Sequence, residues 1–241
     1  MTIAGIDDAQ RKAAKLAGLA GLLPIPFLLY ANFGIHEQLI VEGNVAQTAQ
    51  NIVAHETLFR IGIACDLIYT AGVMVSLAAL YVVLKPVDRT LALLAAFWRL
   101  VYALMWVGMT LNLFDALRLL SGADYLRGFE PERLQALTRL SLSAGLDGYY
   151  VGLLFWALAA TLGSYLFFKS HYIPRALATF GMIASGWCAV CTLAFIIFPG
   201  FGNVVNLWWF DSPMALFEIT VSFWLLFKGL HLPPRIVCND R

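Results

Sequence analysis

The sequence predicts an all-α polytopic membrane protein with six transmembrane helices. Three observations support this fold class: the composition, the length of the apolar segments and the distribution of basic residues. Of the 241 residues, 61% are hydrophobic and only 13% are charged, whereas a soluble domain usually carries about 25% charged residues. Six segments are long and apolar enough to supply the roughly 20 residues that cross a bilayer. Basic residues outside these segments alternate in abundance from one connection to the next, as in membrane proteins.

The six predicted spans form one domain over residues 1–241. They cover residues of about 13–34, 54–84, 90–117, 145–168, 176–198 and 212–230. The first span follows basic residues, as a signal peptide would, but it lacks a small-residue cleavage site and continues through PIPFLLYANF. We therefore expect it to be retained as a transmembrane helix, with a kink at Pro24 and Pro26.

Two connections are predicted to contain helices of their own. Residues 35–53 include GNVAQTAQN, which favours a polar turn and a short helix that leads into the second span. In residues 121–144, Pro131 marks a helix start and is followed by an amphipathic stretch. We expect this stretch to form an amphipathic helix on the membrane surface, in the second outer loop.

The distribution of lysine and arginine predicts the orientation. Four of the 16 basic residues lie in or beside the connection between the third and fourth spans, and two lie within spans. The other ten fall on the opposite side: Arg11, Lys12, Lys15, Lys85, Arg89, Lys169, Arg175, Lys228, Arg235 and Arg241. Because cytoplasmic loops accumulate lysine and arginine, both termini are predicted to be cytoplasmic.

Charge and cysteine content argue against several function classes. The formal net charge is +1 and no basic stripe is present, so no nucleic-acid partner is expected. Of the four cysteines, two form a C-x-x-C at Cys188 and Cys191, in the middle of a predicted span. No second cysteine pair stands in a loop to pass electrons onward, so we interpret them as small packing residues and not as a redox pair.

Several motifs resemble a known family. The runs NIVAHETLFRIGIACDL, LYVVLKPVDRTLALLAAFWRLV, LNLFDALRLLSGADYL, GSYLFFKSHYIPRAL and FEITVSFWLLFKGL occur in this order. The chain thereby resembles, over almost its whole length, a bacterial membrane family known only as domain of unknown function number forty-three eighty-six. The fourth span departs from the family pattern, because it reads LFWALAATLG where relatives tend to carry a phenylalanine-glycine step. The resemblance implies a six-helix protein of the bacterial inner membrane and brings no activity.

Ionisable residues inside the spans can be placed by depth. At a rise of about 1.5 Å per residue, Glu56 lies near the outer edge of the second span, Arg60 roughly 9 Å down and Asp66 roughly 18 Å down, all on one face. The same count places Arg99 level with Asp66, and Glu218 level with Arg60. We therefore predict that Arg60 pairs with Glu218 or Glu56, and that Arg99 pairs with Asp66.

These charges define the candidate site. An unpaired charge in the membrane costs several kcal/mol, and a carboxyl group without a basic partner favours its protonated form, which a general acid needs. The predicted catalytic residues are Glu56, Asp66 and Glu218. Predicted binding residues, whose aromatic members could stabilise a cationic centre, are His55, Arg60, Arg99, Asn112, Asp115, Asp147, Tyr150, Trp106, Trp156 and Trp187.

The favoured function is an acid/base enzyme, of cyclase or isomerase type, that acts on an isoprenoid or other lipophilic small molecule in a pocket in the outer half of the bilayer. Membrane lipids are its other expected partners. Alternatives are a proton-coupled carrier, a binding, sensing or accessory protein, and ion pairs that only fix helix register. No cofactor is expected. A metal reading of His36-Glu37 and His55-Glu56 is weak, because the H-E-x-x-H spacing is missing.

Overall fold

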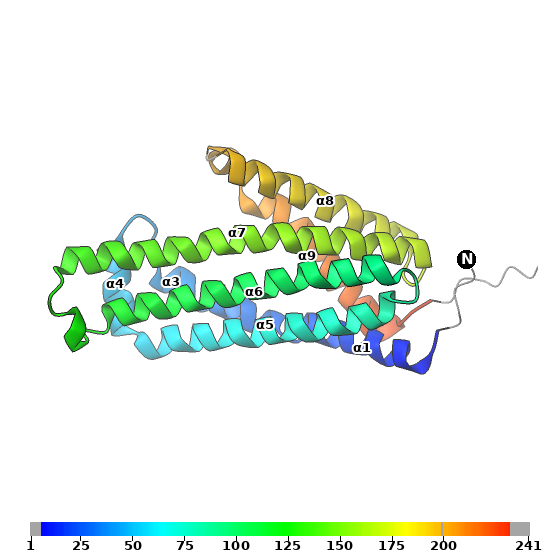
Figure 1. Cartoon of the computed structure of the whole chain (residues 1–241), viewed down its shortest axis with the longest axis horizontal. Coiled ribbons are helices and arrows are strands. Elements are labelled where there is room, and N and C mark those ends of the chain that lie inside the picture. The colour runs from blue at the N-terminus through cyan, green and yellow to red at the C-terminus, as the bar shows by residue number, and fades with distance from the viewer. Residues whose placement is uncertain (1–5, 199, 232–241) are drawn as a thin grey trace, which may run out of the picture. The chain divides into compact units, whose positions relative to one another are not determined.

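The computed structural model describes residues 6–198 and 200–231, with residues 125, 202, 207 and 208 described by their backbone alone. These residues contain helices and no strand (Figure 1). Six helical segments are long and apolar enough to cross a membrane: Asp8–Leu39, Glu56–Leu84, Arg89–Leu120, Pro131–Ser170, Arg175–Ile197 and Trp209–Lys228. The predicted all-α fold class is therefore confirmed, and the chain is a multi-pass membrane protein.

The residues pack as two units. Unit 1 consists of Met1–Leu22, Val75–Arg99 and Leu154–Arg241, and unit 2 consists of Leu23–Met74 and Leu100–Leu153. Three long helices, α5, α6 and α7, each contribute residues to both units. Each unit has its own buried apolar cluster and its own buried charges, and each is described by itself below.

The first span is not a continuous α-helix. It comprises α1 (Asp8–Leu22), α2 (Ile25–Leu29), the π-helix η1 (Tyr30–His36) and α3 (Glu37–Leu39). The predicted kink at Pro24 is present as a break between α1 and α2, where a proline offers no N–H to continue the backbone ladder. The π-helix is a rarer feature that often marks a functional site. It ends on His36, so the distorted segment places that imidazole.

The connection after the first span contains the predicted short helix, α4 (Val45–Ala54). The side chain of Asn44 caps it by accepting a hydrogen bond from the backbone N–H of Gln47, at 3.0 Å. Asparagine is among the best N-cap residues because its side-chain oxygen satisfies an otherwise unpaired donor. The next helix, α5 (Glu56–Leu84), starts after a one-residue turn at His55.

The helix α6 (Arg89–Leu120) is followed by the short 3₁₀-helix η2 (Asp124–Leu126) and then by α7 (Pro131–Ser170). Pro131 starts α7 as predicted, at a position where its missing N–H does no harm. The stretch that follows Pro131 was expected to be a helix on the membrane surface, but it is continuous with the fourth span (Figure 1). With 40 residues, α7 is roughly 60 Å long, twice the thickness of a hydrocarbon core of about 30 Å.

The last part of the chain forms α8 (Arg175–Ile197), η3 (Phe201–Asn203), α9 (Leu207–Phe223) and the π-helix η4 (Trp224–Lys228). The predicted last span starts at residue 212, whereas α9 starts at Leu207 and includes Pro213. Large apolar side chains on α8 recur at seven-residue intervals and are exposed, as at Ile183, Val190 and Ile197. In a membrane protein such a stripe faces lipid.

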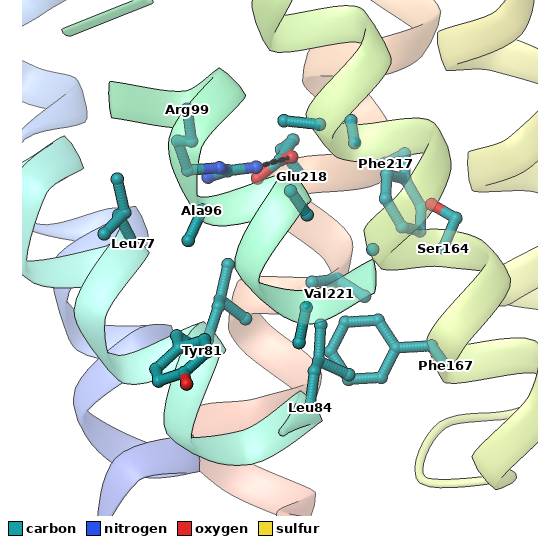
Figure 2. Close-up of a pocket in the computed structure, with 16 residues that line it drawn as sticks. Leu77, Tyr81, Leu84, Ala96, Arg99, Ser164, Phe167, Phe217, Glu218 and Val221 are labelled. Carbon is teal, nitrogen blue, oxygen red and sulfur yellow. Dashed lines mark hydrogen bonds and ion pairs between the residues drawn. The ribbon is translucent and has the colours of Figure 1, made fainter. Parts of the chain in front are cut away.

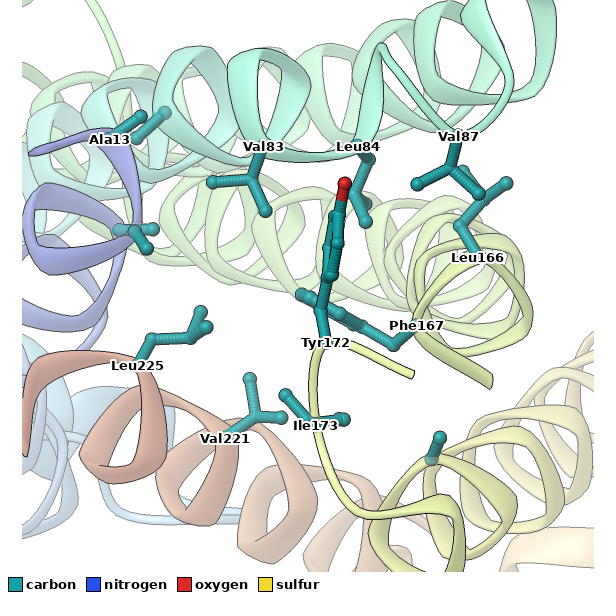
Figure 3. Packing of buried hydrophobic residues seen from close by; sticks show 14 of the residues in the cluster. Ala13, Val83, Leu84, Val87, Leu166, Phe167, Tyr172, Ile173, Val221 and Leu225 are labelled. Atoms are coloured by element: carbon teal, nitrogen blue, oxygen red, sulfur yellow. The ribbon is translucent and has the colours of Figure 1, made fainter. Parts of the chain in front are cut away.

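The core of unit 1 surrounds Tyr172, whose side chain is fully buried. Figure 3 shows its ring pointing toward Leu84 of α5, with Phe167 of α7 beside it. Nε2 of the buried Gln10 donates to the Tyr172 hydroxyl and to the backbone oxygen of Val83, both at 3.2 Å. This polar bridge ties α1, α5 and the α7–α8 connection together at one end of unit 1.

The core of unit 2 joins the end of the first span to α4, α5 and α6. Its buried apolar residues are Ile35, Leu39, Ile52, Phe59, Ile63, Leu113 and Leu117. Phe59 is fully buried, and its ring meets the imidazole of His36 edge-on, with a centroid distance of 5.7 Å and an interplanar angle of 78°. The apolar cluster thus holds His36 against α5.

Candidate functional site

The most deeply buried ionisable pair of unit 2 joins the first span to α5. Nε2 of His36 lies 2.9 Å from Oδ2 of Asp66, and the two side chains are 12% and 0% exposed. Neither Nδ1 of His36 nor Oδ1 of Asp66 has a hydrogen-bond partner in the described part of the chain. Because buried polar atoms are nearly always paired, two unpaired atoms in one pair make it the first candidate for a functional site.

The backbone around the pair makes room for the imidazole. Residue 62 of α5 is a glycine, and a β-carbon there would lie 3.0 Å from Cε1 of His36 and 3.2 Å from Cγ2 of Ile35. A side chain at residue 62 would therefore press on the ring. The π-helix, Gly62 and the edge of Phe59 together fix the direction in which His36 points.

The chemistry of the pair follows from the carboxylate. An ionised aspartate can only accept hydrogen bonds, so Nε2 of His36 carries the proton that it donates to Asp66. In the neutral imidazole, Nδ1 then holds a lone pair, and it holds a proton once the ring is charged. A carboxylate that orients a histidine and stabilises its imidazolium form is the arrangement of a general base.

An aromatic cluster stands next to the pair in unit 2. The hydroxyls of Tyr69 and Tyr102 are 2.8 Å apart, and Tyr69 follows Asp66 by one turn of α5. The indole of Trp106 lies 4.8 Å from the ring of Tyr69 and 5.7 Å from that of Tyr102, between centroids. Nε1 of Trp106 is buried without a partner among the described residues. This cluster thus starts one turn of α5 beyond Asp66.

Unit 1 contains a second buried ion pair. Nη2 of Arg99, from α6, donates to Oε1 of Glu218, from α9, and the two side chains are 9% and 17% exposed. Counted along its own helix, Arg99 lies roughly 15 Å from Arg89, and Glu218 lies roughly 15 Å from Lys228. The pair therefore stands far from the helix ends, where charge is expensive and must be compensated.

The Arg99–Glu218 pair borders a cavity with a volume of about 40 Å³. Figure 2 shows the two side chains facing each other, with Phe167, Leu84 and Val221 farther along the wall. Most of the lining is alanine, leucine or phenylalanine from α5, α6, α7 and α9. One polar exception is Ser164, which is 1% exposed and whose Oγ has no hydrogen-bond partner within the described residues.

The observed pairs correct part of the predicted pairing. Arg99 was expected to pair with Asp66, but it pairs with Glu218, while Asp66 pairs with His36. Of the two partners predicted for Arg60, Glu56 is the one observed, with both side chains 54% exposed. The error arose because α9 begins at Leu207 and the last span at Trp209, so that Glu218 lies deeper than a count from residue 212 indicated.

Most other predicted site residues are members of neither buried pair. His55 is exposed and Nδ1 of its ring bonds to the backbone oxygen of Asn51. Asp115 is exposed and pairs with Arg118. Asp147 is exposed, and Trp187 is 52% exposed on α8. Tyr150 and Trp156 are half-buried. The side chain of Asn112 donates to the backbone oxygen of Gly108 on its own helix.

Sequence reasoning missed His36 and Ser164 as site residues. His36 was counted with the polar residues near the outer edge but not among the catalytic or binding residues. The first span was predicted to end at residue 34, whereas its helical segment runs to Leu39. A metal site built on the histidines lacks ligands: across residues 6–198 and 200–231, no group of three or more His, Cys, Asp or Glu side chains could hold a metal ion.

Comparison with known proteins adds a family and no activity. The model of a family described as "Domain of unknown function (DUF4386)" matches residues 16–229. An uncharacterized protein of Archaeoglobus fulgidus is 24% identical over 154 residues, which is 64% of this chain and 75% of that protein. No solved structure matches the chain.

Proposed function

The chain belongs to the DUF4386 family, and from its own geometry we propose that it is a membrane-embedded acid/base enzyme that acts on a lipophilic small molecule. The observation that supports this proposal best is the His36–Asp66 pair, 2.9 Å apart, with Nδ1 of the imidazole unpaired. Ionisable side chains inside a membrane protein are by default candidates for function. This pair has the specific form of a base and its orienting carboxylate.

The proposed reaction is a proton transfer that needs no cofactor. Nδ1 of His36 takes a proton from an allylic or activated carbon of the substrate, and Asp66 stabilises the imidazolium that forms. The double bond shifts, and the same nitrogen returns a proton to a different carbon. Atoms and charge balance over the cycle. One group that first accepts and then donates suits an isomerase better than a cyclase.

Access to His36 requires movement of the first span. Nδ1 is buried, so a substrate reaches it only when the surrounding helices separate. The interruptions on both sides of α2, at Pro24 and at η1, give the first span two places where backbone hydrogen bonds are already altered. Conformational opening of this kind commonly controls entry to enclosed sites.

The expected substrate is an isoprenoid or a comparable lipid that enters from the bilayer. The ring of Phe59 meets His36, and Tyr69, one turn of α5 from Asp66, packs against Trp106; aromatic rings favour apolar, unsaturated ligands. The proposal includes a bacterial inner-membrane location and entry from the outer half of the bilayer. The excess of basic residues at the opposite helix ends supports this orientation.

Deuterium labelling tests the proposal without a known substrate. The purified protein would be incubated in D₂O with the nonpolar lipid extract of the cells that produced it, and mass spectrometry would search for a lipid that gains deuterium on carbon. We expect labelling with the native chain and at least a tenfold loss in Asp66→Asn and His36→Gln. Asp124→Asn, in the exposed pair with Arg127, is the control and should label normally. Label enters only where the ring proton exchanges with D₂O before it is returned, so the position of the double bond is read as well. Absence of any lipid that gains deuterium or shifts its double bond, or equal conversion by all variants, would refute the proposal.

A proton-coupled carrier is the second candidate, because the first span is broken. Interrupted transmembrane helices often hold the substrate of transporters, and His36 lies at the end of such an interruption. A carrier would place no deuterium on carbon. It would instead show uptake of a lipid-soluble solute into proteoliposomes that depends on an imposed pH gradient and is lost in Asp66→Asn.

A further inference from the structure

We propose that the cavity at Arg99 and Glu218 binds the carboxyl group of a lipophilic carboxylic acid, such as a fatty acid. This site lies in unit 1, whereas the residues of the proposed acid/base centre lie in unit 2. The inference therefore does not rest on the proposed function. It rests on hydrogen-bond donors of Arg99 that the ion pair with Glu218 does not use.

The free donors of the cavity suit a carboxylate. A guanidinium group has five N–H donors, and among the described residues only Nη2 of Arg99 has a partner, Glu218. Nε and Nη1 remain available. Ser164 of α7 also lines the cavity, but its hydroxyl lies beside Gly181 and the ring of Phe217, so the donors to the ligand are those of Arg99. The residue Arg99 is 8% exposed, so these donors belong to a desolvated site where a carboxylate would bind strongly.

Charge is conserved if the acid and Glu218 exchange a proton. The ligand enters the membrane as the neutral acid, and its proton passes to the carboxylate of Glu218. The ligand carboxylate then pairs with Arg99 through the free donors Nε and Nη1, and Glu218 remains as a neutral carboxylic acid that can donate a hydrogen bond. The site holds one positive and one negative charge before and after. No unpaired charge is buried at either stage.

The lining selects a ligand with an apolar tail. The cavity volume of about 40 Å³ is enough for a carboxyl group or two to three water molecules, and not for a whole lipid. Beyond the ion pair, the wall offers hydrocarbon from Leu77, Leu80 and Phe167. A ligand with one negative charge matches Glu218, because that side chain can take up one proton. A phosphate with two negative charges would need two protons to be taken up. The head of the ligand therefore fits the cavity, and the chain continues out of it.

Decanoate is a suitable probe. Radiolabelled decanoate would be added to the full chain in detergent at neutral pH, and binding would be measured together with proton uptake by a pH indicator. Decanoate is mostly ionised at this pH, so binding by the proposed exchange takes up about one proton per bound ligand, because Glu218 becomes protonated. The titratable side chains that line the cavity are Tyr81, Arg99 and Glu218, and only Glu218 can gain that proton.

Variants separate the proposal from ordinary partitioning into detergent. The double variant Arg99→Met, Glu218→Met removes the pair without leaving a buried charge and should lose saturable binding. Glu218→Gln imitates the neutral form, so it should bind decanoate at least as tightly as the native chain while taking up no proton. Asp124→Asn is the matched control at an exposed arginine–carboxylate pair, that of Arg127 and Asp124, and it should change neither quantity.

Three results would overturn the inference. The first is no saturable binding of decanoate to the native chain, as expected if water alone fills the cavity. The second is equal binding of decanol, which has the same chain without a carboxyl group. The third is binding without proton uptake by the native chain. This last measurement needs no variant, so it decides the matter even if a substitution prevents folding.

Discussion

His36 and Gly62 are so close that a β-carbon on residue 62 would lie 3.0 Å from Cε1 of the imidazole. Contacts this short force one partner to move. The glycine is thus what allows a histidine from the π-helix η1 to reach Asp66, one turn farther along α5. The geometry of the proposed reaction therefore depends on a glycine, which has no reactive side chain.

Gly62→Val should displace His36 from Asp66. The added side chain overpacks the region, and such changes typically destabilise a protein by about 1–3 kcal/mol. We expect a lower thermal unfolding midpoint in detergent and a change in the ¹⁵N chemical shifts of the His36 ring. The control is Gly108→Val on α6, where a β-carbon would meet nothing within 4 Å. If Gly62→Val leaves both readouts unchanged, the glycine does not position the histidine.

Gly18→Ala should weaken the packing of α1 against α9. A β-carbon on Gly18 would lie 2.5 Å from the backbone oxygen of Ser222 and 2.7 Å from the backbone nitrogen of Leu226. Backbone atoms cannot turn aside as side chains do, so the helices must separate, at a cost of about 1–3 kcal/mol. Unfolding in mixed micelles measures the change. Gly186→Ala on α8, with open space around it, should be neutral, and a similar loss there would contradict the explanation.

The two arginine–glutamate pairs should differ sharply when one partner is removed. Glu218→Met leaves Arg99 buried without its anion, which typically costs about 3–5 kcal/mol. Adding Arg99→Met should recover most of that loss, because no unpaired charge remains. Glu56→Met leaves Arg60 more than half exposed, and exposed pairs are worth roughly 0–1 kcal/mol. A double-mutant cycle at each pair measures the coupling, and equal values at the two pairs would contradict this account.

The number of spans could be predicted because apolar length is a local property. Each span carries enough consecutive hydrocarbon to be recognised without knowing its neighbours. The ends of the helices cannot be recognised in the same way. The stretch after Pro131 has the same helical period inside and outside the membrane, so the sequence alone could not show that it continues into the fourth span as one helix.

Pairing partners were harder to predict, because they depend on helix ends and on helix rotation. A shift of the last span's start from residue 212 to Trp209 was enough to assign Glu218 the wrong depth and to give Arg99 the wrong partner. The π-helix η1 adds a second difficulty. Its wider turns change the direction of every later side chain relative to a regular helix, so the direction of His36 could not be obtained from an α-helical count.

Orientation in the membrane leads to the last prediction, that both termini lie in the cytoplasm. Lys85 and Arg89 border the turn between α5 and α6, and Lys169 and Arg175 border the turn between α7 and α8. Basic residues near short connections resist translocation, so both turns should stay inside. A green fluorescent protein fused after Arg241 should fluoresce in a bacterial host, and alkaline phosphatase at the same point should be inactive. Insertion of the phosphatase at Gly122, between α6 and α7, should give the opposite result. Phosphatase activity at the C-terminus would reverse the orientation, and substrate entry to the His36–Asp66 pair from the outer half of the bilayer would then be wrong.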